Sequence, residues 1–215
     1  GVTEAAVSSP QRDWWLRAVL VLQAPRAVFS ALRDESDEDE LSARQEPALA
    51  IAILAGIAAV LASAAAGRLM DDPAYDGVLI AVWAFLGGAL YGAFVYWAGG
   101  LLLHFGLVAL GSQGSYRRDR HVLAFACVPV ALSLLVWLPR LALYGEDVFR
   151  TGGRDHGAGA AVFAWLGVGF VAWAAALLAV GIRTIEGWPW GKALGALAIA
   201  AALPALVALA SAGVL

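Results

Sequence analysis

The segment Ala158–Ile182, AGAAVFAWLGVGFVAWAAALLAVGI, decides the fold class of this chain, because its 25 residues include no charged side chain. An α-helix needs about 20 residues to cross a hydrocarbon core of about 30 Å. In lipid the backbone polar groups must be satisfied within the segment, and no alternation with a period of two indicates a strand. The segment is therefore predicted to be a transmembrane helix.

Four other apolar segments are long enough to cross a membrane. The five predicted spans are Pro47–Gly67, Gly77–Leu110, His121–Gly145, Ala158–Ile182 and Gly191–Leu215. Apolar residues make up 61% of the 215 residues and charged residues only 14%, whereas soluble domains carry about 25% charged residues. We predict an all-α polytopic membrane protein, with a five-helix transmembrane bundle over residues 47–215 and a cytoplasmic region over residues 1–46.

The second predicted span is too long for one straight crossing, because its 34 residues would reach about 51 Å as an α-helix. It contains the glycine pairs Gly87-Gly88 and Gly99-Gly100. We expect this helix to tilt, to kink at a glycine pair or to project from the membrane. A re-entrant hairpin is the alternative, and it would raise the number of crossings to six.

The distribution of basic residues predicts the orientation. Ten fall in the N-terminal region and the loops on its side: Arg12, Arg17, Arg26, Arg33, Arg44, Arg117, Arg118, Arg120, Arg183 and Lys192. Four fall on the other side: Arg68, Arg140, Arg150 and Arg154. Because cytoplasmic loops are enriched in Lys and Arg, we predict a multi-pass plasma membrane protein with a cytoplasmic N-terminus and an outer C-terminus.

The region before the first span has two parts. Trp14–Arg33 has an amphipathic helical pattern, and Pro25 is expected to start a second short helix there, since proline is tolerated in a first turn. This pattern is typical of a helix lying in the membrane interface; a helix packed on the bundle is the alternative. Asp34–Glu40, DESDEDE, is predicted to be a solvated linker.

The chain lacks the sequence signatures of common enzymes. It has no HExxH, GxSxG or P-loop motif, its three histidines are scattered, and Cys127 is its single cysteine. We therefore predict no catalytic residue, no cofactor and no metal site. The net charge of −3 does not favour nucleic acid as a partner. Ionisable residues are nearly absent at mid-membrane depth, with His104 expected near the inner rim and Arg140 near the outer rim, which argues against ion transport.

Tryptophans and basic residues beside the predicted spans are the candidate contacts with the membrane interface or a partner. This set comprises Trp14, Trp15, Pro25, Arg26, Phe29, Arg117, Arg118, Arg120, Arg183, Trp188, Trp190 and Lys192. Two small-xxx-small pairs, Gly88–Gly92 and Gly191–Gly195, are expected to pack helices of the same chain, with a homodimer seam as the alternative.

Two stretches resemble the Yip1 domain family, in its bacterial branch. One is Val21–Asp34, VLQAPRAVFSALRD; the other is Leu177–Ala196, LLAVGIRTIEGWPWGKALGA, in which Arg183, Lys192 and Ala193 occupy the family's polar turn and final helix start. The paired glycine-and-aspartate signature of eukaryotic members is not evident between the first two spans. The resemblance implies an integral membrane protein without catalytic residues; eukaryotic members are trafficking factors that interact with small GTPases and organise membranes.

These observations leave three hypotheses for function. The first is a non-catalytic membrane protein that organises the membrane or binds membrane lipids, a protein partner or a second copy of itself. The second is a small transporter, channel or lipid-translocating protein lined by the glycine-rich second span. The third is an intramembrane enzyme, for which the sequence offers no recognisable set of residues.

Overall fold

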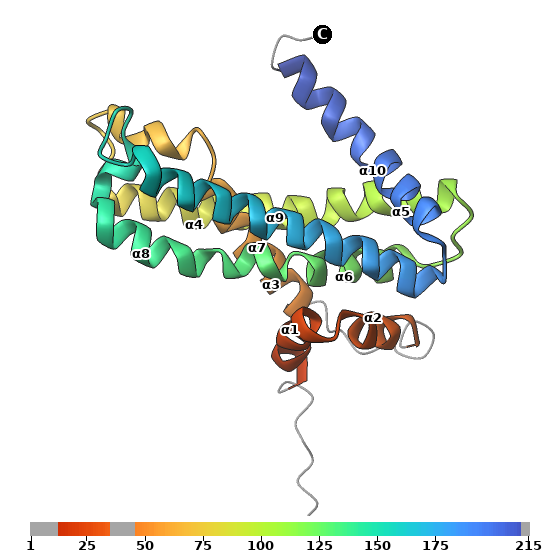
Figure 1. Ribbon diagram of the computed structural model, residues 1–215. Helices are drawn as coiled ribbons and strands as arrows, with labels where there is room; N and C mark the ends of the chain where they lie inside the picture. The colour runs from red at the N-terminus through yellow and green to blue at the C-terminus, as the bar shows by residue number, and fades with distance from the viewer. Residues whose placement is uncertain (1–12, 35–45, 212–215) are drawn as a thin grey trace, which may run out of the picture.

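A computed structural model describes residues 13–34 and 46–211, and within these ranges the chain forms helices and no strand (Figure 1). The α-helices are α1 (Asp13–Gln23), α2 (Pro25–Asp34), α3 (Glu46–Leu61), α4 (Gly77–Phe94), α5 (Gly100–Ala109), α6 (Tyr116–Ala126), α7 (Val128–Leu132), α8 (Leu134–Tyr144), α9 (Gly157–Glu186) and α10 (Trp190–Ser211). Two 3-10 helices, η1 (Ala66–Asp71) and η3 (Gly145–Phe149), and a π-helix, η2 (Val95–Gly99), complete the described elements. The predicted all-α membrane fold is confirmed.

Four of the five predicted spans are helical runs long and apolar enough to cross a membrane. They are Gly77–Ala109, Tyr116–Phe149, Gly157–Glu186 and Trp190–Ala210. The first predicted span was expected to reach Gly67, but α3 ends at Leu61 and would cover only about 24 Å. The Ser63 hydroxyl donates to the Val60 carbonyl at 2.6 Å and accepts from the Ala66 N–H at 3.2 Å. This local bonding replaces the regular helical pattern and ends the helix early.

The second span is a single helical run that a π-turn interrupts. α4 passes through η2 into α5, and the irregular turn ends at the pair Gly99-Gly100. The re-entrant hairpin is therefore wrong for this segment. A π-turn inserts one extra residue into the hydrogen-bond ladder and is a recognised cause of helix bending, so the break falls at the second glycine pair and not at Gly87-Gly88.

The third span begins five residues earlier than predicted. Ser115 caps α6 by accepting a hydrogen bond from the Arg118 N–H at 3.2 Å, and the helix starts at Tyr116. Arg117, Arg118 and Arg120 therefore lie in the first turns of a helix and not in a basic loop. The prediction of a loop there was wrong because a serine N-cap outweighs the local excess of charge.

Helices α3 and α4 meet through glycines at very short range. A methyl group built on Gly56 would lie 2.3 Å from the Gly88 carbonyl oxygen, and one on Gly92 would lie 2.3 Å from the Ala52 carbonyl oxygen. Gly88–Gly92 thus packs helices within the chain, as predicted. In the second pair, a methyl group on Gly191 would meet nothing within 4 Å, whereas one on Gly195 would lie 3.4 Å from a Leu110 side-chain carbon, so this pair makes no backbone contact of that kind.

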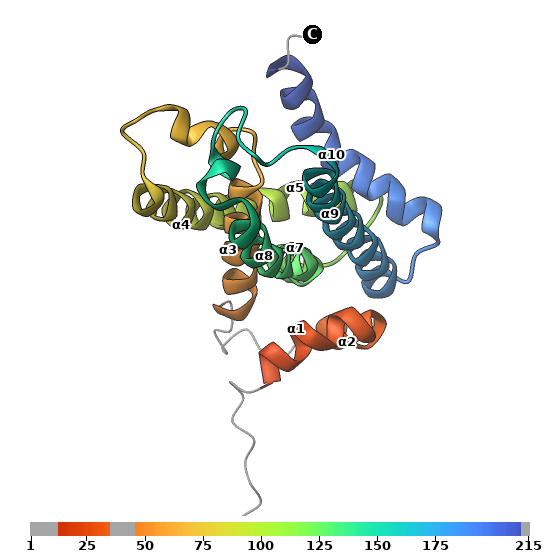
Figure 2. The same cartoon turned by 60° about the vertical axis from the view of Figure 1, so that its left-hand side comes forward.

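Helix α10 packs on the bundle at its start and is exposed towards its end. A methyl group on Gly106 of α5 would lie 2.4 Å from the Ala196 carbonyl oxygen, so small residues bring α5 and α10 together there. Beyond this contact α10 leaves the bundle, and residues 201–210 are all exposed (Figure 2). The described part of α10 is therefore positioned by its first turns, which pack against α5 and α9.

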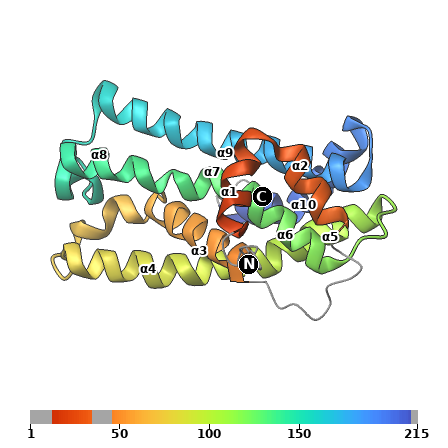
Figure 3. The ribbon, with the colours of Figure 1, turned by 90° about the horizontal axis from the view of Figure 1, so that it is seen from below.

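The two N-terminal helices dock on the bundle, with α1 crossing it near its middle and α2 running towards one end (Figures 1 and 3). Val21, Val28 and Phe29 are buried and form one cluster with residues of α6 and α9, among them Val122 and Ile185. The sequence left open whether this region packs on the bundle or lies in the membrane interface. In the structure, one face of each helix packs on the bundle. The break between α1 and α2 falls at Pro25, as predicted.

Loops predicted for opposite sides of the membrane lie at opposite ends of the bundle. At one end, Asp71 accepts a hydrogen bond from the Thr151 N–H at 2.8 Å, which joins the two loops predicted to lie outside. At the other end, the Ser112 hydroxyl donates to Glu186 at 2.7 Å, which joins the α5–α6 loop to the end of α9. The two sets of loops are thus separated along the bundle, while their assignment to cytoplasm and exterior stays a prediction.

Candidate functional site

A short turn between α9 and α10 brings two tryptophans beside the last turn of α9. Gly187 ends α9 with φ of +66°, a left-handed conformation that glycine adopts at low cost. Pro189 follows, and α10 begins at Trp190. Trp188 and Trp190 therefore lie close to Arg183, which is one turn before the end of α9.

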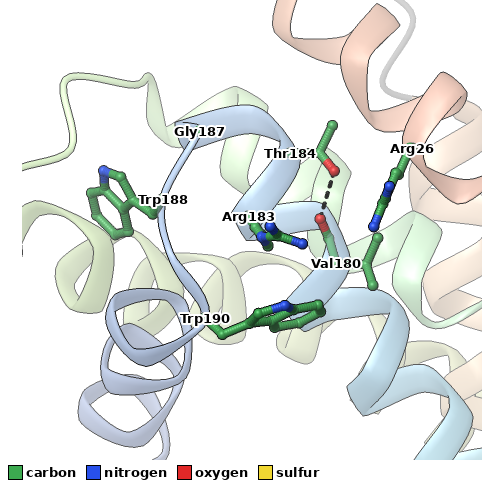
Figure 4. Close-up of a pocket in the computed structure, with 7 residues that line it drawn as sticks. All are labelled: Arg26, Val180, Arg183, Thr184, Gly187, Trp188 and Trp190. Atoms are coloured by element: carbon green, nitrogen blue, oxygen red, sulfur yellow. Dashed lines mark hydrogen bonds between the residues drawn. The ribbon is translucent and has the colours of Figure 1, made fainter.

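A pocket of about 240 Å³ opens at this turn, where α2 packs against α9 (Figure 4). Its lining residues are Arg26, Val180, Arg183, Thr184, Gly187, Trp188 and Trp190. The Arg183 guanidinium carbon lies 4.8 Å from the centre of the Trp190 ring, and the Lys192 Nζ lies 4.0 Å from the centre of the Trp188 ring. Such cation–π contacts fix the cations against the rings and leave their outer N–H groups able to bind an anion.

The pocket is electropositive. Among the described residues, neither Arg26 nor Arg183 forms an ion pair with a carboxylate. Glu186 lies one turn after Arg183, but it is engaged by the Arg118 guanidinium and by the Ser112 hydroxyl. The nearest acid in the sequence is therefore neutralised by another partner.

A network of buried charges ties α5, α6 and α9 together beside the pocket. The Asp119 side chain is fully buried; its Oδ2 is 2.7 Å from the His104 Nδ1, and its Oδ1 is 3.3 Å from the Arg118 guanidinium. Arg118 also pairs with Glu186, so its guanidinium lies between two carboxylates. His104 contacts one of these carboxylates, Asp119. Since breaking a buried pair leaves an uncompensated charge, this network fixes the end of α9 and the turn that follows it.

Arg120 has no carboxylate partner among the described residues and is held by aromatic rings. Its guanidinium carbon lies 3.9 Å from the Trp97 ring centre, 4.4 Å from Tyr116 and 5.2 Å from Tyr96. The residue is 4% exposed. The three rings stabilise the charge by cation–π attraction and join α6 to the π-turn of the second span.

Comparison with protein families identifies the chain. The family model described as the Yip1 domain matches residues 19–212. The chain belongs to the Yip1 domain family. No curated protein sequence and no solved structure gives a significant match. The match begins within α1 and ends beyond α10, so both the docked N-terminal helices and the apolar helices belong to this Yip1 domain.

The predicted interface residues of the Yip1 domain separate into two groups. Arg26 joins Arg183, Trp188 and Trp190 in the pocket although it lies more than 150 positions before them in the sequence. Lys192 lies next to this group, against the Trp188 ring. Trp15 is exposed on α1, Pro25 starts α2, and the Trp14 side chain is outside the described residues.

The other predicted contacts are buried or partly buried. Phe29 is fully buried under α2, Arg120 lies inside its aromatic cage, and the Arg118 side chain is largely buried between two carboxylates. Arg117 is partly buried in the first turn of α6. The sequence pattern did not reveal which face of each helix meets the bundle, and the assignment of these residues to membrane or partner contact stays a prediction.

The buried network of this Yip1 domain was missed by the sequence analysis. A signal was present, because Asp119 is the only acidic residue between Gly77 and Gly145. A lone acid among apolar and basic residues is costly unless it is paired. Its partner His104 lies 15 positions before it, and Glu186, which shares Arg118 with it, lies 67 positions after it, so the sequence alone did not bring them together.

Proposed function

We propose that this Yip1 domain protein is a non-catalytic membrane protein that organises the bilayer surface, with α1 inserted among the lipid headgroups. The observation that carries the proposal is the exposed apolar face of α1, opposite the face docked on the bundle. Trp15, Leu16, Val19 and Leu20 are each between 44% and 50% exposed. A contiguous apolar patch is typical of a membrane or protein contact, and here tryptophan accompanies aliphatic side chains as in interfacial helices.

The depth of α1 along the bundle supports this proposal. α1 packs against α7, which begins at Val128. From Val128 to Tyr144, where α8 ends, the third helical run extends roughly 25 Å at 1.5 Å per residue, which is close to the hydrocarbon thickness of about 30 Å. If Tyr144 marks one surface of the hydrocarbon, α1 lies near the other surface, where its apolar face meets lipid.

The alternative function of ion transport gains no support from the charged groups. The buried charges around Asp119 gather at one end of the bundle, and Arg140 pairs with Asp155 at the other end. No ion pair among the described residues joins the two ends. Because a polar pathway needs groups that can hold charge at intermediate depth, we favour a structural role at the membrane surface.

The proposal is tested by measuring the depth of α1 in proteoliposomes of the full-length protein. A cysteine replaces Val19 in a Cys127→Ala background and carries an environment-sensitive NBD label. We expect blue-shifted emission and quenching by brominated lipids. The matched control is a label at Gln113, an exposed residue of the α5–α6 loop, which should emit as in water. Unquenched, water-like emission from the Val19 label would overturn the proposal.

A further inference from the structure

The pocket between α2, α9 and α10 has the chemistry of a phosphate site. Arg26 and Arg183 line it from two different helices, and no described carboxylate neutralises either one. Arginine presents a planar fork of N–H donors that matches the oxygens of a phosphate. The volume of about 240 Å³ is below the roughly 300–1,000 Å³ of sites that enclose a drug-sized ligand, which suits a headgroup better than a whole molecule.

One face of α9 continues from this pocket as an apolar groove. A groove of about 560 Å³ is lined by Ala161, Val162, Trp165, Leu166, Gly169, Phe170 and Trp173. Trp165 and Arg183 are 18 residues apart, which is five turns at 3.6 residues per turn, so they lie on the same face. Val162 and Val180 have the same spacing. Groove and pocket therefore follow each other along one side of α9.

We infer that this pocket binds the phosphate of an anionic phospholipid, whose acyl chains lie along the same face of α9. The inference rests on the proposed function, which puts this region at the bilayer surface. From Arg183 to Trp173 the helix rises about 15 Å, which is half of a hydrocarbon core of about 30 Å. An acyl chain attached to a headgroup at Arg183 thus reaches the near end of the groove. A soluble phosphate ester has no acyl chain that could contact the apolar groove.

The test uses purified full-length protein in a mild detergent with equal amounts of phosphatidylglycerol and phosphatidylcholine, analysed by native mass spectrometry. Wild-type protein should retain phosphatidylglycerol preferentially. The double variant Arg26→Gln, Arg183→Gln should lose that preference by about tenfold to thirtyfold. The matched control Arg68→Gln, Arg150→Gln removes two exposed charges at the other end of the bundle and should retain the preference.

Three results would overturn the inference: an unchanged preference in the pocket variant, an equal loss in the control, or displacement of the lipid from wild-type protein by millimolar glycerol phosphate. The last result would assign the site to a soluble phosphate ester. The single variant Arg26→Gln keeps the test decisive if the double variant does not fold, because Arg26 is exposed. A quenched label at Val19 together with a failed lipid test would refute this inference and leave the proposed function standing.

Discussion

The contact between α3 and α4 predicts a large difference between two adjacent glycine substitutions. A methyl group on Gly88 would lie 2.4 Å from the Ile57 Cα, whereas a methyl group on Gly87 would meet nothing within 4 Å. Ordinary van der Waals contact begins near 3.4 Å, so Gly88→Ala forces the backbone of α3 to move by about 1 Å. Overpacking of this kind costs about 1–3 kcal/mol.

Gly87→Ala is the matched control, because both variants gain the same helix propensity of about 1 kcal/mol. The difference between them therefore isolates the clash. At about 2–4 °C per kcal/mol for a chain of this size, Gly88→Ala should melt about 2–12 °C below Gly87→Ala. The assay is thermal unfolding of the detergent-solubilised protein, in which size-exclusion chromatography measures the folded fraction that remains after heating at each temperature. Equal melting temperatures would show that the two helices are not in backbone contact, and the packing argument would fail.

Three other predictions follow from the charged groups and the topology. Glu186→Gln removes one carboxylate from the buried network and should lower the free energy of unfolding by roughly 3–5 kcal/mol; chemical denaturation measures it, and a loss below 1 kcal/mol contradicts the network. Hydrogen bonds from Thr151 hold the pKa of Asp71 below its ordinary value, so their stabilisation is complete at neutral pH and is lost as the pH falls below about 4. The melting temperatures of wild type and Thr151→Ala should therefore converge in acid, and a constant gap would refute the link. In intact cells, a membrane-impermeant thiol reagent should label a cysteine at Ala74 and spare one at Gln113; the reverse pattern inverts the orientation.

Hydropathy predicted where the helices are, but not where each one ends. The apolar run of α9 was readable because nothing in its sequence competes with a membrane helix. The early end of α3 at Leu61 depends on two hydrogen bonds of Ser63, and the early start of α6 depends on a serine cap. Both are local side-chain effects that average hydropathy does not contain.

The residue types of the candidate site were predictable, whereas their arrangement was not. Arg26, Arg183 and the tryptophans of the last turn were selected because basic and aromatic residues flank membrane spans. The pocket exists because α2 docks on α9, and this docking depends on long-range burial of Phe29. A one-dimensional pattern shows that Phe29 lies on an apolar face, but it does not show whether lipid or protein covers that face.

The buried network also imposes an order on biosynthesis. Arg118 and Glu186 are 68 positions apart, so at about 5–20 residues per second the ribosome needs roughly 3–14 s to add Glu186 after Arg118. During that interval α6 carries Arg118 with Asp119 as its only network carboxylate, and the interface that receives the end of α9 is incomplete. A nascent chain that stops before α9 is finished therefore presents a charged, half-formed surface, and we expect membrane quality-control proteases to degrade it faster than the completed bundle.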